Sequence, residues 1–387
     1  MKRTFTKNIL LLILCAVCLW SCGPVPEVAT RYFDKAEIEH DDVRLTIFYP
    51  STGSIKALIA LREIGFIPID KLTVIGVYHE NEVTDYKKSI EYIKKNKIGW
   101  IQFHQLSAPL SKYTLFQKNA CSDEFEAIFK KSDGIIFFGG ADIPPYLYGR
   151  KTDLLTHIET PYRHFLELSC IFHLLGGLQD SRFKGFLESK PEFPVLGICL
   201  GCQSLNVGTG GTLIQDVWSE KYGLKFFEDV VELGSENWHT NPLDRLYPEQ
   251  KLIPYNMHPI KLKEDGKFCA EMGFRSNDTP YILSAHHQMV DTPGKGIKVI
   301  ATTLDGKVIE AVEHEHFPNV LGVQFHPEFP ILWDTTEKFR FTPQDKEEKS
   351  LHTFLEENPL SFDFHKRIWA WFSQKLKEFK SKKTTLP

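Results

Sequence analysis

Residues 194–203 have the sequence PVLGICLGCQ, in which a short apolar run leads into glycines and cysteines. The run 194–198 predicts a buried strand, and residues 204–207 can continue as a helix. Gly197 and Gly201 allow a tight, strained turn that lifts the Cys199 thiol clear of the sheet, as in the G-x-S-x-G nucleophile elbow. The segment therefore predicts an α/β fold with a nucleophile at a strand-to-helix turn.

A helix start also suits a reactive thiol, because unpaired N–H groups and the helix dipole stabilise negative charge there. Two other interpretations of the segment stay open. A buried structural cysteine in a strand–helix connection has the same pattern. Cys199 and Cys202 also form a C-x-x-C pair, which is typical of redox proteins.

Apolar strands and helical patterns alternate on the N-terminal side of this segment. Strands are expected at 44–48, 72–78, 100–103 and 134–138, and helices at 55–65, 86–95, 123–131 and 161–176. Residues 268–322 are strand-rich, with strands at 281–283, 298–301 and 321–325. The alternation predicts a doubly wound, mostly parallel sheet flanked by helices on both faces. We place this single main domain at residues 43–335.

The remaining C-terminal residues, 336–387, are predicted to be an extension of the domain. Apolar residues between Phe364 and Phe379 indicate an amphipathic helix, and Lys380 to Pro387 are expected to be a frayed basic tail. This extension and the strand–helix unit before Leu72 are expected to cap the sheet or shape a lid.

The composition is that of an ordinary globular protein, with 42% hydrophobic and 25% charged residues among 387. The formal net charge of -4 gives no basic face for nucleic acid. A small-molecule partner is therefore expected, and the sequence does not indicate a protein partner.

The first 22 residues have the form of a secretory signal, with three basic residues before an apolar run at 9–20. That run is shorter than the roughly 20 apolar residues that a membrane-spanning helix needs. The sequence LWSC at 19–22 resembles a bacterial lipobox, although Trp20 replaces the usual small residue. We expect a 1–22 lipoprotein signal, lipidation of Cys22 and a 23–42 tether, so the protein would be exported and anchored to a bacterial membrane, facing the periplasm. Simple secretion and an uncleaved anchor are the alternatives.

Five cysteines follow Cys22, an odd number at irregular spacing, which does not predict a disulfide framework. In an exported chain, an odd number of cysteines indicates at least one free thiol that has a function. Cys121, Cys170 and Cys269 are expected to be small buried hydrophobic residues.

Residues 322–328, with the sequence GVQFHPE, offer a base for the thiol. Side chains two apart on a strand point to one side, and Pro327 fits only a strand end or edge. His326 can then take the thiol proton, while Glu328 holds its imidazole in the right tautomer.

Residues 137–145, with the sequence FFGGADIPP, run from an apolar strand into paired glycines. Such glycines let backbone N–H groups face a developing oxyanion, together with the N–H of Leu200. By itself this segment would be interpreted as a plain turn.

Together the three motifs resemble the class I glutamine amidotransferase fold, which is flavodoxin-like. The stretches GGADIPPYLYG (139–149), GICLGCQSLNVGTGGTLIQD (197–216) and SAHHQ (284–288) resemble its gamma-glutamyl hydrolase branch, and the resemblance covers roughly 72–328. It implies a triad of Cys199, His326 and Glu328 and oxyanion donors at Gly140 and Leu200. It also implies a substrate pocket built from Gly139, Gln203, His286, His287 and Gln288.

Two departures from that branch concern the substrate. Leu200 stands where the branch often has arginine after the nucleophile, and Arg163-His164 stands where it has an Arg-Asp pair. The resemblance therefore indicates the reaction type better than the identity of the substrate.

We predict hydrolysis of gamma-glutamyl amides through a thioester on Cys199, with no metal or organic cofactor required. His286 and His287 are weak candidates for metal ligands, because no matching carboxylate or cysteine spacing accompanies them. His239 and His258 are interpreted as surface or core residues. The alternatives are an amidotransferase that supplies ammonia to a partner, a non-catalytic binding lipoprotein and a redox thiol protein.

Overall fold

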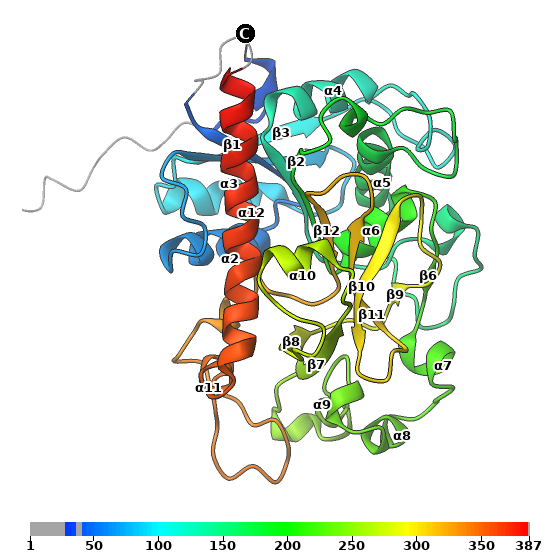
Figure 1. Ribbon diagram of the computed structural model, residues 1–387, viewed down its shortest axis with the longest axis vertical. Helices are drawn as coiled ribbons and strands as arrows, with labels where there is room; N and C mark the ends of the chain where they lie inside the picture. The colour runs from blue at the N-terminus through cyan, green and yellow to red at the C-terminus, as the bar shows by residue number, and fades with distance from the viewer. Residues whose placement is uncertain (1–27, 36–40, 386–387) are drawn as a thin grey trace, which may run out of the picture.

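The computed structural model describes residues 28–35 and 41–385 (Figure 1). The predicted signal, Cys22 and part of the predicted tether lie outside these residues, so lipid anchoring stays a prediction. Within the described residues, no helix has both the length and the apolar character that a membrane span needs.

A ten-stranded sheet forms the centre of the protein, in the order β3-β2-β1-β4-β5-β12-β11-β10-β7-β8. Strands from β3 to β12 in this order pair in parallel, and the rest pair antiparallel. The parallel strands are β1 (Val43–Phe48), β2 (Leu72–His79), β3 (Ile101–Leu106), β4 (Gly134–Phe137), β5 (Val195–Ile198) and β12 (Val320–Val323). The antiparallel strands are β7 (Asn256–Leu262), β8 (Tyr281–Ser284), β10 (Ile297–Thr303) and β11 (Ile309–His314). The predicted doubly wound, mostly parallel sheet is confirmed.

Strand β1 lies in the middle of the sheet, where Leu45 is in register with Val74 of β2 and Gly134 of β4. The expectation that the unit before Leu72 caps the sheet or shapes a lid is therefore wrong. The physical reason is that all six residues of β1 are buried, which suits an inner strand covered on both faces. Chain connections diverge between β1 and β4, which leaves a crevice at the carboxyl ends of these strands.

Helices cover both faces of the parallel strands (Figure 1). One face packs against α2 (Thr52–Glu63), α3 (Tyr86–Lys95) and α12 (Pro359–Thr385), and the other against α4 (Ser122–Lys131), α5 (Pro161–Leu175) and α6 (Leu200–Gly208). The shorter helices are α7 (Val217–Lys221), α8 (Phe227–Glu232), α9 (Pro242–Leu246), α10 (Lys267–Glu271) and α11 (Leu351–Glu357), and β6 (Leu213–Ile214) pairs with β9 (Met289–Val290) outside the main sheet.

Two segments at the ends of the chain are more closely packed than expected. Within the predicted tether, the Phe103 N–H donates to Ala29 O at 2.8 Å, and Tyr32 and Phe33 are buried. At the other end, α12 lies along one face of the sheet (Figure 1), and the side chain of its residue Trp369 is fully buried. The prediction of a frayed tail from Lys380 is wrong, because α12 continues to Thr385.

The last turns of α12 are held by a buried carboxylate. Lys383 Nζ donates to Ser132 O at 3.0 Å and to Asp133 Oδ1 at 3.2 Å, and Asp133 has no exposed surface. We expect Lys383→Met to lower the free energy of unfolding by about 1–2 kcal/mol, because charged hydrogen bonds to a buried acceptor are lost. The matched control is Lys377→Met on the exposed side of the helix, which should change stability by less than about 0.5 kcal/mol. Urea unfolding measures both, and equal effects would contradict the docked helix end.

Candidate active site

Cys199 lies at the turn between β5 and α6, with φ 51° and ψ −106°. A positive φ is strained for a residue with a Cβ, and such strain is typical of nucleophile elbows. The Cys199 N–H donates to Val323 O at 2.8 Å, which joins the turn to β12. The predicted strand-to-helix turn at Cys199 is therefore confirmed.

The two flanking glycines are required by close packing. A Cβ on Gly201 would lie 2.0 Å from Phe137 O, and one on Gly197 would lie 2.5 Å from Gly201 O. Any larger residue would push α6 away from β4 and β5. The turn thus depends on both glycines.

His326 and Glu328 lie together just beyond the end of β12. The His326 Nδ1 and Glu328 Oε1 atoms are 2.8 Å apart, and both side chains are almost fully buried. The pairing arises in a turn after Val323 rather than from alternation along a strand. The His326 N–H donates to Leu283 O at 2.9 Å, which fixes this turn against β8.

The environment of His326 favours the charged imidazolium. Burial by itself lowers the pKa of His326, but the charges of Glu328 and Cys199 and hydrogen bonds with both outweigh burial and raise the pKa to about 10. The surroundings of the ring therefore favour its protonated form. A protonated imidazole beside Cys199 can stabilise a thiolate and can later donate a proton to a leaving group.

The glycine loop after β4 is held by a buried arginine. Arg163 Nη2 donates to Phe138 O at 2.7 Å and to Gly139 O at 3.0 Å, while its Nε donates to Glu167 Oε1 at 2.7 Å. Because N–H and C=O point in opposite directions across a trans peptide, the Gly140 N–H points away from Arg163. That N–H is therefore available to an oxyanion, as is the N–H of Leu200 at the start of α6.

A cleft of about 520 Å³ opens at the crevice between β1 and β4. Its lining includes Tyr49 and Ser51 after β1, Gly139 after β4, and His326. Cys199 lies directly behind Gly139, whose added Cβ would be 3.4 Å from the cysteine Cβ. Sequence analysis missed the contribution of Tyr49 and Ser51, although both directly follow a strand, where ligands of parallel sheets bind.

Four predicted substrate-binding residues do not line this cleft. Gln203 is buried and donates to Gln288 O at 3.2 Å and Gln324 Oε1 at 3.3 Å. His287 lies between Asp142 and Asp216 and lines a different cavity, beside Trp218. Burial lowers the pKa of His287, but hydrogen bonds with the two carboxylates outweigh it and raise the pKa to about 9.

The other two residues, His286 and Gln288, are also buried away from the cleft. His286 belongs to a cluster with His239, His258 and Glu310, whose ligand atoms all lie within 4.8 Å of one another. Only Gly139, of the five predicted pocket residues, lies at the cleft. After β8, His286 and Gln288 are buried inside the protein, and His287 faces the other cavity.

The described cysteines are all free and buried. Cys202 has no exposed surface, and burial raises its pKa, so it is a poor thiolate. Gln324 Nε2 lies 3.7 Å from Cys199 Sγ. The geometry therefore assigns different environments to the two cysteines of the C-x-x-C pair.

The sequence comparisons with known proteins agree with one another. The sequence model of a family described as Peptidase C26 matches residues 74–328. The chain is 31% identical over 203 residues to a putative glutamine amidotransferase-like protein, YvdE, of Lactococcus lactis, covering 52% of this chain and 68% of that protein. It is 29% identical over 213 residues to the gamma-glutamyl-gamma-aminobutyrate hydrolase PuuD of Escherichia coli, and the match covers 55% of this chain and 68% of that protein. The match to a solved structure of a glutamine amido transferase from Methylobacillus flagellatus covers 86% of this chain and 94% of that chain, with 13% sequence identity and a TM-score of 0.40.

Proposed function

The chain belongs to the peptidase C26 family of cysteine-nucleophile hydrolases, and we propose that it hydrolyses gamma-glutamyl amide bonds with Cys199 as the nucleophile. The observation that carries the proposal is the strained Cys199 turn beside the His326–Glu328 pair, whose Nδ1 and Oε1 atoms are 2.8 Å apart. The similarity to PuuD supports the gamma-glutamyl substrate class.

In the first step, Cys199 Sγ attacks the gamma-carbonyl carbon and forms a tetrahedral oxyanion. The N–H groups of Gly140 and Leu200 donate hydrogen bonds to this oxygen. The protonated His326 then donates its proton to the leaving amine, and the C–N bond breaks. The products of this step are a free amine and a gamma-glutamyl thioester on Cys199.

In the second step, His326 takes a proton from water, and the resulting hydroxide attacks the thioester carbonyl. Collapse of the second tetrahedral intermediate breaks the C–S bond and releases glutamate. The proton stays on His326, which restores the initial pair of charges. Glu328 keeps the imidazole oriented through both steps, because its carboxylate accepts the Nδ1 hydrogen bond.

The test is a panel of gamma-glutamyl amides with leaving amines of different size and charge, each matched by its alpha-glutamyl isomer. We expect glutamate and amine in equal amounts from at least one gamma-linked compound, and no cleavage of its alpha-linked isomer. Acid quenching should trap a chain whose mass has increased by one glutamyl group, located on the peptide that contains Cys199. The proposal fails if no gamma-linked compound is cleaved.

The similarity to YvdE keeps glutamine amidotransferase activity as a second candidate. Both activities use the same thioester, and they differ in whether free ammonia is the product or is passed to another enzyme. Glutamine belongs in the panel for this reason. Rapid ammonia release from glutamine, with slow turnover of every larger amide, would favour the amidotransferase.

A further inference from the structure

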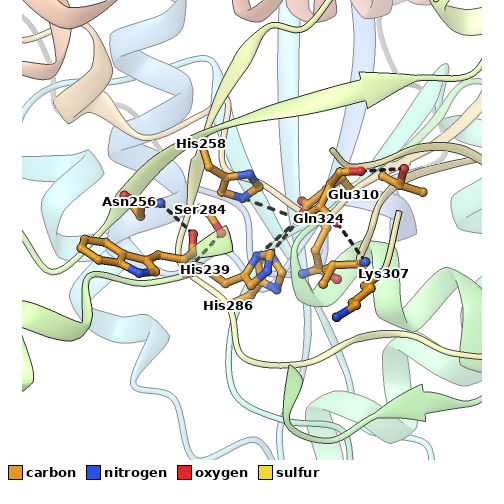
Figure 2. Close-up of polar contacts among 12 residues, drawn as sticks. His239, Asn256, His258, Ser284, His286, Lys307, Glu310 and Gln324 are labelled. Atoms are coloured by element: carbon orange, nitrogen blue, oxygen red, sulfur yellow. Dashed lines mark hydrogen bonds and ion pairs between the residues drawn. The ribbon is translucent and has the colours of Figure 1, made fainter. Parts of the chain in front are cut away.

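A second group of chemically capable side chains lies in the antiparallel half of the sheet. His258 is on β7, Glu310 is on β11, His286 follows β8, and His239 precedes α9. Figure 2 shows the three imidazole rings turned toward the Glu310 side chain. Three of the four side chains have no exposed surface, and His286 is 4% exposed. The group is therefore a closed polar cluster inside the protein.

The distances within the cluster match those between the ligands of one small ion. Glu310 Oε1 lies 3.4 Å from His239 Nδ1, 3.6 Å from His258 Nε2 and 3.6 Å from His286 Nε2. Tetrahedral zinc, with bonds of about 2.0–2.1 Å, has ligand atoms about 3.4 Å apart. All four ligand atoms lie within 4.8 Å of one another, so binding would need only a small contraction.

Hydrogen bonds on the far side of two rings set their orientation. His286 Nδ1 lies 2.9 Å from Gln288 O, and His258 Nδ1 lies 3.2 Å from Pro259 O. A backbone carbonyl can only accept, so each Nδ1 carries a proton and each ring turns its Nε2 toward the cluster. Histidine ligands of metals are held by this kind of outer contact.

The centre of the cluster lacks a positive partner. The ring nitrogens that face Glu310 and both of its carboxylate oxygens have no hydrogen-bond partner among the described residues. A buried carboxylate without a partner is costly, and so are buried ring nitrogens without a partner. A cation at the centre removes both penalties.

We propose that His239, His258, His286 and Glu310 bind one zinc ion. Three imidazoles and one carboxylate suit zinc, whereas magnesium and calcium prefer oxygen ligands. Four buried protein ligands leave no position for substrate, so the ion is structural. The ion links the segment before α9, which contains His239, and the segment after β8, which contains His286, to strands β7 and β11.

One residue, Gln324, connects the zinc site to Cys199, although the zinc site does not depend on the proposed reaction. The Gln324 N–H donates to Glu310 O at 2.8 Å, and the Gln324 side chain reaches Cys199. Zinc binding therefore stabilises β11, whose backbone holds Gln324 beside Cys199.

The test measures metal content and stability of the full chain. After zinc loading and gel filtration, we expect about one zinc per chain by mass spectrometry, and a lower melting temperature after removal by a strong chelator. Glu310→Gln and His258→Asn should each retain less than about a tenth of the zinc. The control is His365→Asn, a fully buried histidine on α12 whose ring nitrogens have no hydrogen-bond partner among the described residues, and this variant should retain all the zinc.

A cobalt substitution of the unmodified chain does not depend on whether the variants fold. Tetrahedral cobalt bound to nitrogen and oxygen should give visible bands without thiolate charge transfer. Thiolate bands would locate the ion at Cys199 or Cys202 and overturn the proposal. So would a chain that takes up no zinc and melts at the same temperature with zinc and with chelator, or zinc retention by both variants.

Discussion

Replacing Cys199 with alanine is expected to lower kcat/KM for a cleaved gamma-glutamyl amide by at least about 10⁴-fold. Without Sγ no thioester can form, and His326 and Glu328 are left with only water to activate. Loss of the nucleophile alone costs nearly as much as loss of a whole triad, because the residues act as a unit. Initial-rate measurements on the panel substrate test this expectation.

The matched control is Cys202→Ala, three residues further on. Cys202 lies inside α6 and has no exposed surface, whereas Cys199 is 7% exposed, so removal of the Cys202 thiol should change kcat/KM by less than about threefold. The two variants separate a nucleophile from a redox pair. A C-x-x-C redox protein would lose its activity in both variants, and Cys199→Ala with more than about 1% of the activity would contradict the mechanism.

Replacing Arg163 with methionine is expected to lower the free energy of unfolding by about 3–5 kcal/mol. Arg163 and Glu167 form a buried ion pair, with exposed fractions of 4% and 0%. Burial raises the pKa of Glu167 even though Arg163 opposes the shift. Removing Arg163 leaves that carboxyl without its cation and the carbonyls of Phe138 and Gly139 without their donor.

The double variant Arg163→Met with Glu167→Leu tests the cause of this loss. Replacing both members of a buried pair is often neutral for stability, so the double variant should recover most of the loss. Activity should stay low in both variants, because Arg163 orients the Gly139–Gly140 loop. Urea unfolding and kcat measure the two effects, and a single variant within about 1 kcal/mol of the wild-type chain would contradict the assignment.

Two strands of the main sheet that sequence analysis missed, β7 and β11, share a physical cause. β7 contains His258 and Pro259, and β11 contains Glu310, residues that are typical of surfaces or turns. Here the two charged or titratable side chains are fully buried because they face one another. A periodicity analysis treats each polar residue as exposed, so a strand that buries polar side chains in a cluster escapes it.

The sequence by itself determined the Cys199 turn and the His326–Glu328 pair. Each depends on residues a few positions apart, and their geometry follows from glycine sterics and a short turn. The tertiary structure alone decided the central place of β1, the cleft residues Tyr49 and Ser51, and the cluster around Glu310. These depend on which strands pair. An apolar run in the sequence indicates that a strand is buried on both faces. Its backbone hydrogen bonds would be the same with any neighbouring strand, so the sequence of one strand does not identify the strand with which it pairs. Packing in the folded chain decides that pairing.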